Sequence, residues 1–116
     1  MGGRSSREKG RRGELLAAKA LSDIGIVSSR AGYAGYSVED LQHTLRGVHI
    51  EVKYMARPSI PKAYRQAIGD AARSGATPTC LTKQVSQATK AEPWLLTIAL
   101  ADLWALVDAC NEARPV

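Results

Sequence analysis

Apolar residues recur along this chain with two different periods, and the change of period separates expected helices from expected strands. The first helical pattern covers about Lys9 to Ile24 and stops at Gly25, a residue suited to the C-terminal end of a helix. Residues 48–55, Val-His-Ile-Glu-Val-Lys-Tyr-Met, alternate instead and predict a strand. One side of this strand carries Val48, Ile50 and Val52, and the other carries His49, Glu51 and Lys53.

The remaining patterns complete a mixed α/β order. Further strands are expected at about 26–30, 38–45, 77–83 and 94–99. A second helix is expected from Ser59 or Ile60 to about Ser74, with Pro61 in its first turn and Gly75 after its end. A closing helix covers about 100–112. The order α-β-β-β-α-β-β-α predicts one domain, residues 9–116, with a mixed central sheet of about five strands flanked by helices, preceded by a flexible basic arm at residues 1–8.

Asp40 joins the alternating strand if residues 38–45 and 48–55 form a hairpin. Arg46-Gly47 is a plausible two-residue turn. In that register Gln42 pairs with Glu51 and Asp40 with Lys53, so both carboxylates and the amine share one side of the sheet. A slip of one residue would move Asp40 to the other side, so the prediction depends on the register.

Two carboxylates beside a lysine suit phosphodiester hydrolysis. Oxygen ligands of this kind bind Mg²⁺, and the cation lowers the pKa of a bound water and neutralises phosphate charge. The amine of Lys53 can stabilise developing negative charge or orient the attacking hydroxide. The simpler alternative is a cross-strand salt bridge, which contributes little at a surface.

Charge supports an anionic partner. The net charge is +5 and the pI is near 9.5. One basic cluster lies in the first twelve residues and comprises Arg4, Arg7, Lys9, Arg11 and Arg12. A second follows the alternating strand and comprises Lys53, Arg57, Lys62 and Arg65. Cys80 and Cys110 have no metal-ligand spacing and fit reduced thiols of a cytoplasmic protein, and no apolar run is long enough to span a membrane.

Glu14 leaves two interpretations open. Ala17, Ala18 and Leu21 share its helix face, which would turn its carboxylate inward toward the sheet. Alternatively it is an exposed glutamate of the first helical turn, stabilised by the helix dipole. His43 and His49 are expected to be structural or peripheral, because neither has a partner pattern for zinc.

In this order, Glu14, Asp40 and Glu51-Val52-Lys53 resemble the motifs of the PD-(D/E)xK nuclease superfamily. The start Lys9-Gly-Arg-Arg-Gly-Glu-Leu-Leu16 and the segment Ser29-Arg-Ala-Gly32 are similar to archaeal-type and phage Holliday junction resolvases. The resemblance covers roughly residues 9–110. It implies a restriction-endonuclease-like fold, a homodimer, and an intracellular phage or prokaryotic enzyme that cuts four-way DNA junctions symmetrically with Mg²⁺ or Mn²⁺.

The resemblance also implies roles for single residues. Asp40, Glu51 and the Val52 carbonyl would bind the metal, with Glu14 in its first or second coordination shell. Lys53 would act on the attacking water or the scissile phosphate. Arg30 and a serine (Ser28, Ser29 or Ser37) would contact DNA near the glycine-rich loop.

Several positions depart from the family pattern or stay open. The family's Pro-Asp is Glu39-Asp40 here, and Leu15 stands where some relatives have a basic residue. Tyr33 and Tyr36 could stack on exposed bases or simply pack the loop. Gln66 resembles a helix glutamine of related nucleases, although a solvated position is the simpler interpretation. Alternatives to a resolvase are a nuclease of this fold with restriction-like, nicking or repair activity, and a non-catalytic DNA-binding module.

Overall fold

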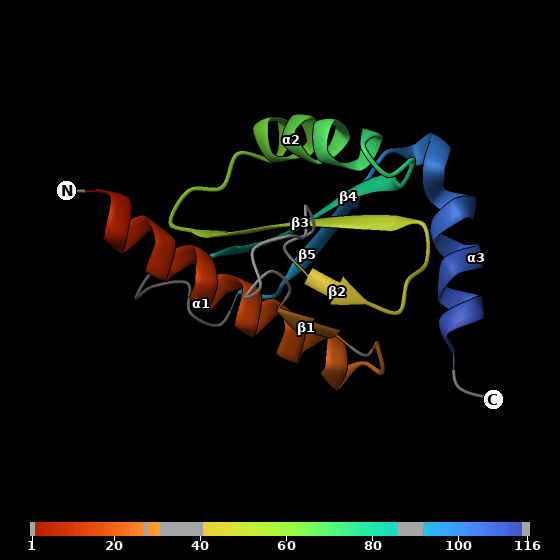
Figure 1. Cartoon of the computed structure of the whole chain (residues 1–116), viewed down its shortest axis with the longest axis horizontal. Coiled ribbons are helices and arrows are strands. Elements are labelled where there is room, and N and C mark those ends of the chain that lie inside the picture. The colour runs from red at the N-terminus through yellow and green to blue at the C-terminus, as the bar shows by residue number, and fades with distance from the viewer. Residues whose placement is uncertain (1, 27, 31–40, 86–91, 115–116) are drawn as a thin grey trace.

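Among the described residues, helices α1 and α2 lie on opposite sides of a small sheet, and α3 lies at one end of it (Figure 1). The computed structural model describes residues 2–26, 28–30, 41–85 and 92–114, and for residues 2–9 and 28–30 it describes the backbone alone. Along the chain the elements are α1 (Gly2–Asp23), β1 (Ser28–Arg30), β2 (Leu41–His43), β3 (Val48–Met55), α2 (Ile60–Ala72), β4 (Thr77–Gln84), β5 (Leu95–Ile98), the 3-10 turn η1 (Leu100–Asp102) and α3 (Leu103–Ala113).

The described strands form two sheets. β3, β4 and β5 make a three-stranded mixed sheet, in which β3 and β4 are parallel and β4 and β5 antiparallel. Helix α2 supplies the crossover that two parallel neighbours require. β1 and β2 pair antiparallel in a separate two-stranded sheet. The mixed α/β class is therefore confirmed, whereas the five described strands do not form the single central sheet that the sequence predicts.

The predicted hairpin between residues 38–45 and 48–55 is wrong over its described part. Gln42 lies opposite Ser29 of β1, and Glu51 lies opposite Cys80 of β4. The pairing of Asp40 with Lys53 involves a residue outside the described part of the chain.

The turn itself explains why these two strands separate. Val48 N–H donates to the Leu45 carbonyl at 3.3 Å, and Gly47 has φ +75°. Arg46 does not have positive φ. Two-residue hairpins favour turns with positive φ at the first central residue, or at both, because turns of the opposite hand splay the strands. With Gly47 alone in the left-handed region, the chain turns where predicted but β3 pairs with β4 instead of β2.

The core lies between α1 and the sheet. Buried Ala17, Ala18 and Leu21 of α1 pack with Val48 and Ile50 of β3. Gly25 ends the helix at φ +93°, and Ile26 N–H donates to the Leu21 carbonyl at 2.9 Å. This arrangement satisfies a terminal carbonyl of the helix and brings Ile26 onto the core.

Helix α1 begins at Gly2, well before its predicted start at Lys9. The backbone of residues 2–8 is therefore helical where a separate basic arm was expected. Arg, Lys and Glu are good helix formers, and no proline interrupts them, so a helix stabilised by its packed C-terminal half can continue through this polar stretch.

Helix α2 covers the other side of the sheet. Ser59 caps it, with its Oγ accepting from Lys62 N–H at 3.4 Å, and Pro61 lies in the first turn. Ala63, Ala67 and Ala71 are its buried residues. Gly75, at φ +68°, follows its end. The predicted caps of this helix are confirmed, and its alanine stripe lets it approach the polar side of β3.

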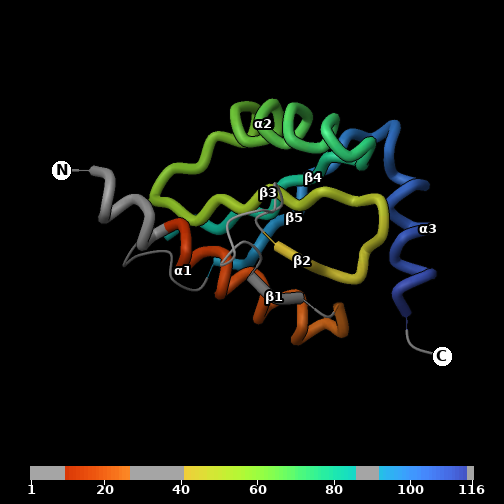
Figure 2. Tube along the Cα trace, viewed as in Figure 1, coloured from red at the N-terminus to blue at the C-terminus, as the bar shows by residue number. Residues whose placement is uncertain are grey.

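The C-terminal helix lies at one end of the sheet (Figure 2). Leu106 and Ala109 pack against the core. Leu100 and Trp104 are instead 85% and 74% exposed. Within the described residues, no helix is both long and apolar enough to cross a membrane.

Candidate metal site beside a basic pocket

Strand β3 brings three polar side chains under α2. Because side chains alternate along a strand, His49, Glu51 and Lys53 point away from the α1 core. His49 and Glu51 are 0% and 1% exposed, and the side chain of Lys53 is 30% exposed. The strand therefore has an apolar and a polar side, as predicted. Its polar side is largely buried, so the ion pair on it is not a simple surface salt bridge.

Glu51 is the centre of this group. Its Oε1 lies 3.3 Å from Nε2 of His49, and its Oε2 lies 3.6 Å from Nζ of Lys53. Burial raises the pKa of Glu51, but the hydrogen bond with His49, the charge of Lys53 and a hydrogen bond with Asp70 together lower it more. The pKa therefore lies below its ordinary value of 4.5, and Glu51 is a carboxylate at neutral pH.

Asp70 reaches the same place from α2. It lies next to buried Ala71 and one turn after buried Ala67, so it lies at the edge of the helix's inner stripe. Ligand atoms of His49, Glu51 and Asp70 all lie within 4.8 Å of one another. In the part of the chain that the structure describes, these are the residues whose spacing suits a shared metal ion.

His49 and Asp70 were not predicted as ligands, although the sequence contains signs of both. His49 precedes Glu51 by two residues in a strand, which puts both on one side. Asp70 is seven residues from Ala63 and three from Ala67, a spacing that places it on their side of a helix. What the sequence does not give is the packing of α2 over β3.

A basic pocket of about 260 Å³ opens beside Lys53, at the N-terminal end of α2. Its lining residues are Lys53, Met55, Arg57, Ser59, Lys62, Ala63 and Gln66. Three cationic side chains and the positive end of the helix dipole favour a negatively charged group such as a phosphate. Gln66 is an exposed position of α2, as expected, but it also lines this pocket.

Glu14 lies on α1 and is half-buried. It shares a face with buried Ala17, Ala18 and Leu21, so this stripe points inward as predicted. The alternative of a first-turn glutamate is wrong, because α1 begins at Gly2. Glu14 does not belong to the group of possible ligands formed by His49, Glu51 and Asp70.

The structure describes the other predicted site residues to different extents. Asp40, Tyr33, Tyr36 and Ser37 lie outside the described residues, as does Glu39. For Ser28, Ser29 and Arg30 the backbone in β1 is described, and for Arg4, Arg7 and Lys9 the backbone in α1. Exposed cationic side chains are present at Arg11, Arg12, Arg57, Lys62 and Arg65. The Val52 carbonyl, proposed as a metal ligand, belongs to β3, whose Val52 side chain packs against the core.

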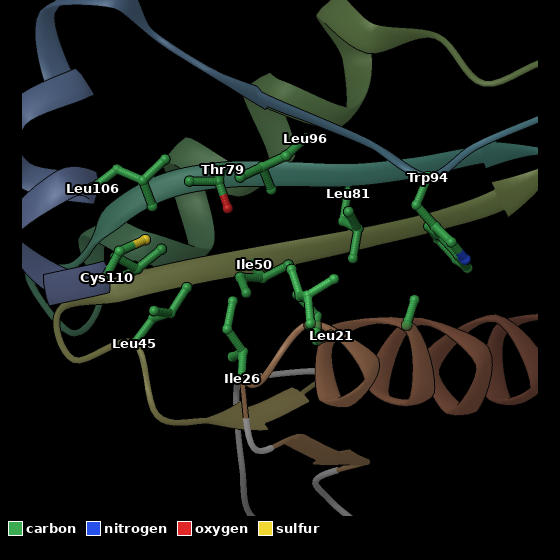
Figure 3. Close-up of a pocket in the computed structure, with 13 residues that line it drawn as sticks. Leu21, Ile26, Leu45, Ile50, Thr79, Leu81, Trp94, Leu96, Leu106 and Cys110 are labelled. Carbon is green, nitrogen blue, oxygen red and sulfur yellow. The ribbon is translucent and has the colours of Figure 1, made fainter. Parts of the chain in front are cut away.

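The opposite side of the sheet contains a different kind of cavity. It has a volume of about 380 Å³ and is lined almost entirely by apolar side chains from α1, the sheet and α3 (Figure 3). Leu21, Ile50, Leu81 and Leu106 point into it. Its lining residues form no cluster of charged or metal-binding groups, so the candidate site lies on the α2 side of β3.

Comparison of this chain with protein-family models, curated proteins and solved structures found no match. The functional argument therefore rests on the residues themselves and on the geometry of β3 and α2.

Proposed function

We propose that this protein is a divalent-metal-dependent DNA endonuclease with the four-way junction as its target. The observation that carries the proposal is the position of Glu51, a buried carboxylate paired with Lys53 on one side of β3 and next to a basic pocket. A carboxylate that binds a cation, an amine, and a basic surface for phosphate are the groups that metal-assisted phosphodiester hydrolysis needs.

Each group of residues has its own role in the proposed reaction. Arg57 and Lys62 bind a backbone phosphate in the pocket through charge, without reading bases. Lys53, which lines this pocket and contacts Glu51, stabilises the negative charge that develops on the attacked phosphate. Glu51 would hold a cation such as Mg²⁺ or Mn²⁺, which would lower the pKa of a bound water. Asp40 and the Val52 carbonyl are the further ligands proposed from sequence.

The junction as target rests on the resemblance of the Lys9–Leu16 segment and the Glu51-Val52-Lys53 motif to junction resolvases. Paired symmetric nicks require two active sites related by a two-fold axis, whereas one chain supplies one Glu51–Lys53 pair. We therefore propose a homodimer. Exposed Leu100, Leu103 and Trp104 are apolar groups that a second copy would cover.

A second function has one observation in its favour. Glu51 already contacts His49 and Lys53, so the polar group can be a buried stabilising network in a non-catalytic DNA-binding module. Such a module would bind DNA with strong salt dependence and would not cut it.

The test is incubation of the purified protein with labelled four-way junction, flap and linear duplex side by side, with Mg²⁺, with Mn²⁺ and with a chelator. We expect cation-dependent, paired symmetric nicks in the junction. Preferential cutting of flap or linear duplex would support nuclease activity but reject the four-way junction as its target. Salt-dependent binding without scission of any substrate would favour the non-catalytic module.

A further inference from the structure

The group formed by His49, Glu51 and Asp70 has a composition unlike that of an all-oxygen magnesium site. Mg²⁺ takes oxygen ligands in a strict octahedron and keeps several of its waters. An imidazole nitrogen instead suits softer first-row metals such as Co²⁺ and Zn²⁺, whereas Mn²⁺ prefers oxygen ligands as Mg²⁺ does. His49 brings its Nε2 to 3.3 Å from Glu51 Oε1.

That distance suits two ligands of one ion. Bonds of about 2.0–2.2 Å place neighbouring ligand atoms of a four-coordinate ion about 3.3–3.6 Å apart. The three ligand atoms all lie within 4.8 Å of one another. A side-chain movement on the order of 1 Å therefore completes a three-ligand set with bonds of this length.

The proximity of the two carboxyl groups also favours a cation. The ligand oxygens of Asp70 and Glu51 lie within 4.8 Å of each other. Two carboxylates this close repel each other, and a cation between them removes that repulsion. Lys53 contacts the other oxygen of Glu51. The side of the group that faces Asp70 therefore carries one imidazole and two carboxyl groups.

The burial of the group also fits a bound ion that has an entry route. His49 and Glu51 are fully buried, and a carboxylate in such a place needs strong compensation. Asp70 is half-buried at the edge of α2, so the group is open on one side. An ion can enter there and retain water on its exposed side.

We propose that His49 Nε2, Glu51 and Asp70 form a binding site for a borderline transition metal ion, of the Co²⁺ or Zn²⁺ kind, in preference to Mg²⁺. This inference deepens the proposed function, because Glu51 belongs both to the proposed active site and to this metal site. Any catalytic role of the metal rests on the proposed function. It gives α2 a direct part in the site through Asp70, and it assigns His49 a role beyond packing.

The test measures metal binding without DNA. Metal-free protein is titrated with Co²⁺ and followed by the visible absorption of the bound ion, and Mg²⁺ and Zn²⁺ are then added as competitors. We expect one Co²⁺ per chain, displacement by Zn²⁺, and no displacement by a tenfold excess of Mg²⁺. Absence of a Co²⁺ complex, or displacement by that excess of Mg²⁺, would overturn the proposal.

Three variants identify the ligands. His49→Gln keeps a hydrogen-bonding group near Glu51 but removes the imidazole, and Asp70→Asn keeps the shape of a half-buried side chain but removes its charge. Each should weaken Co²⁺ binding by at least about 100-fold, the upper end of the loss seen when only a residue supporting a ligand is removed. Asp108→Asn, at an exposed position of α3, is the matched control and should bind as the wild type does.

Folding is checked by circular dichroism and thermal unfolding, since His49 is buried. If His49→Gln does not fold, Asp70→Asn decides alone. Wild-type Co²⁺ affinity in folded Asp70→Asn would overturn the proposal. Failure of the nuclease is a separate result: Co²⁺ binding that depends on Asp70, without DNA cleavage, would reject the proposed function and retain this metal site.

Discussion

The amine of Lys53 lies 3.6 Å from Oε2 of Glu51, and through this contact a buried carboxylate is connected to a basic pocket at the protein surface. Glu51 is 1% exposed, while the Lys53 side chain is 30% exposed and lines the pocket with Arg57 and Lys62. A single residue thus contacts both the acid that would hold a cation and the place where a phosphate would bind.

Lys53→Met should lower the rate of junction cleavage by at least about 100-fold, as loss of a group that stabilises transition-state charge does. Lys62→Met is the matched control, because Lys62 lines the same pocket without contacting Glu51 in the described interactions. It should reduce the salt dependence of DNA binding by about one phosphate contact and leave the maximal cleavage rate unchanged. If Lys53→Met cleaves the junction at the wild-type rate, Lys53 only forms an ion pair with Glu51 and has no role in catalysis.

The close approach of α1 to β3 depends on Gly13. A Cβ at this position would lie 2.5 Å from the Cβ of Tyr54, whose ring stacks on Trp94. Gly13→Ala should therefore lower the free energy of unfolding by about 1–3 kcal/mol, the usual cost of overpacking.

Gly10→Ala provides the comparison for Gly13→Ala. Nothing lies within 4 Å of a Cβ at Gly10, which is an exposed position of the same helix. This substitution should raise the free energy of unfolding by about 0.5–1 kcal/mol, because alanine loses less backbone entropy than glycine. Denaturant unfolding of both variants checks the pair, and equal effects would contradict the predicted contact with Tyr54.

Tyr64 connects α2 to the end of the three-stranded sheet. Its hydroxyl accepts from Ala99 N–H at 3.1 Å and donates to the Pro78 carbonyl at 3.4 Å. Tyr64→Phe leaves these backbone groups without this partner and should cost about 1–3 kcal/mol of unfolding free energy. Denaturant unfolding measures the loss. A change of less than about 0.5 kcal/mol, ordinary for a surface substitution, would argue against the contact.

The two thiols should differ in reactivity. Cys80 is 0% exposed, and burial raises its pKa, with a further rise from Glu51 against a lowering by Thr97. Cys110 is exposed. Because the thiolate is the reactive form, a thiol reagent at neutral pH should label Cys110 in the folded protein and Cys80 only after denaturation. Mass spectrometry of digested protein identifies the labelled residue, and rapid native labelling of Cys80 would contradict its burial.

The sequence predicted the elements better than their pairing. The helix ends at Gly25 and Gly75 and the cap at Ser59 depend on local backbone chemistry, which the sequence contains. The alternation along β3 likewise assigned Ile50 to the core side and Glu51 to the opposite side. Pairing depends on contacts between distant residues and on the hand of a turn. A positive φ at Gly47 without one at Arg46 separated β2 from β3 and removed the predicted hairpin.

Part of the site could be predicted, because that part depends on residues close together in the sequence. Glu51 and Lys53 are two residues apart on one strand, so their contact is local. Asp70 lies on a different element, and its approach to Glu51 depends on how the alanine stripe of α2 packs over β3. The proposed contribution of Asp40 stays a prediction, because that residue lies outside the described part of the chain.

The most direct test of the central claim is the cleavage of a labelled four-way junction by Glu51→Gln, measured beside its binding to the same junction. Glutamine keeps the size of the buried side chain but removes the charge that would hold a cation. Glu112→Gln, at an exposed position of α3, is the control. We predict that Glu51→Gln binds the junction as tightly as wild type and makes no cation-dependent nicks, whereas the control cuts normally. Wild-type cleavage by folded Glu51→Gln would contradict the assignment of this carboxylate to the active site.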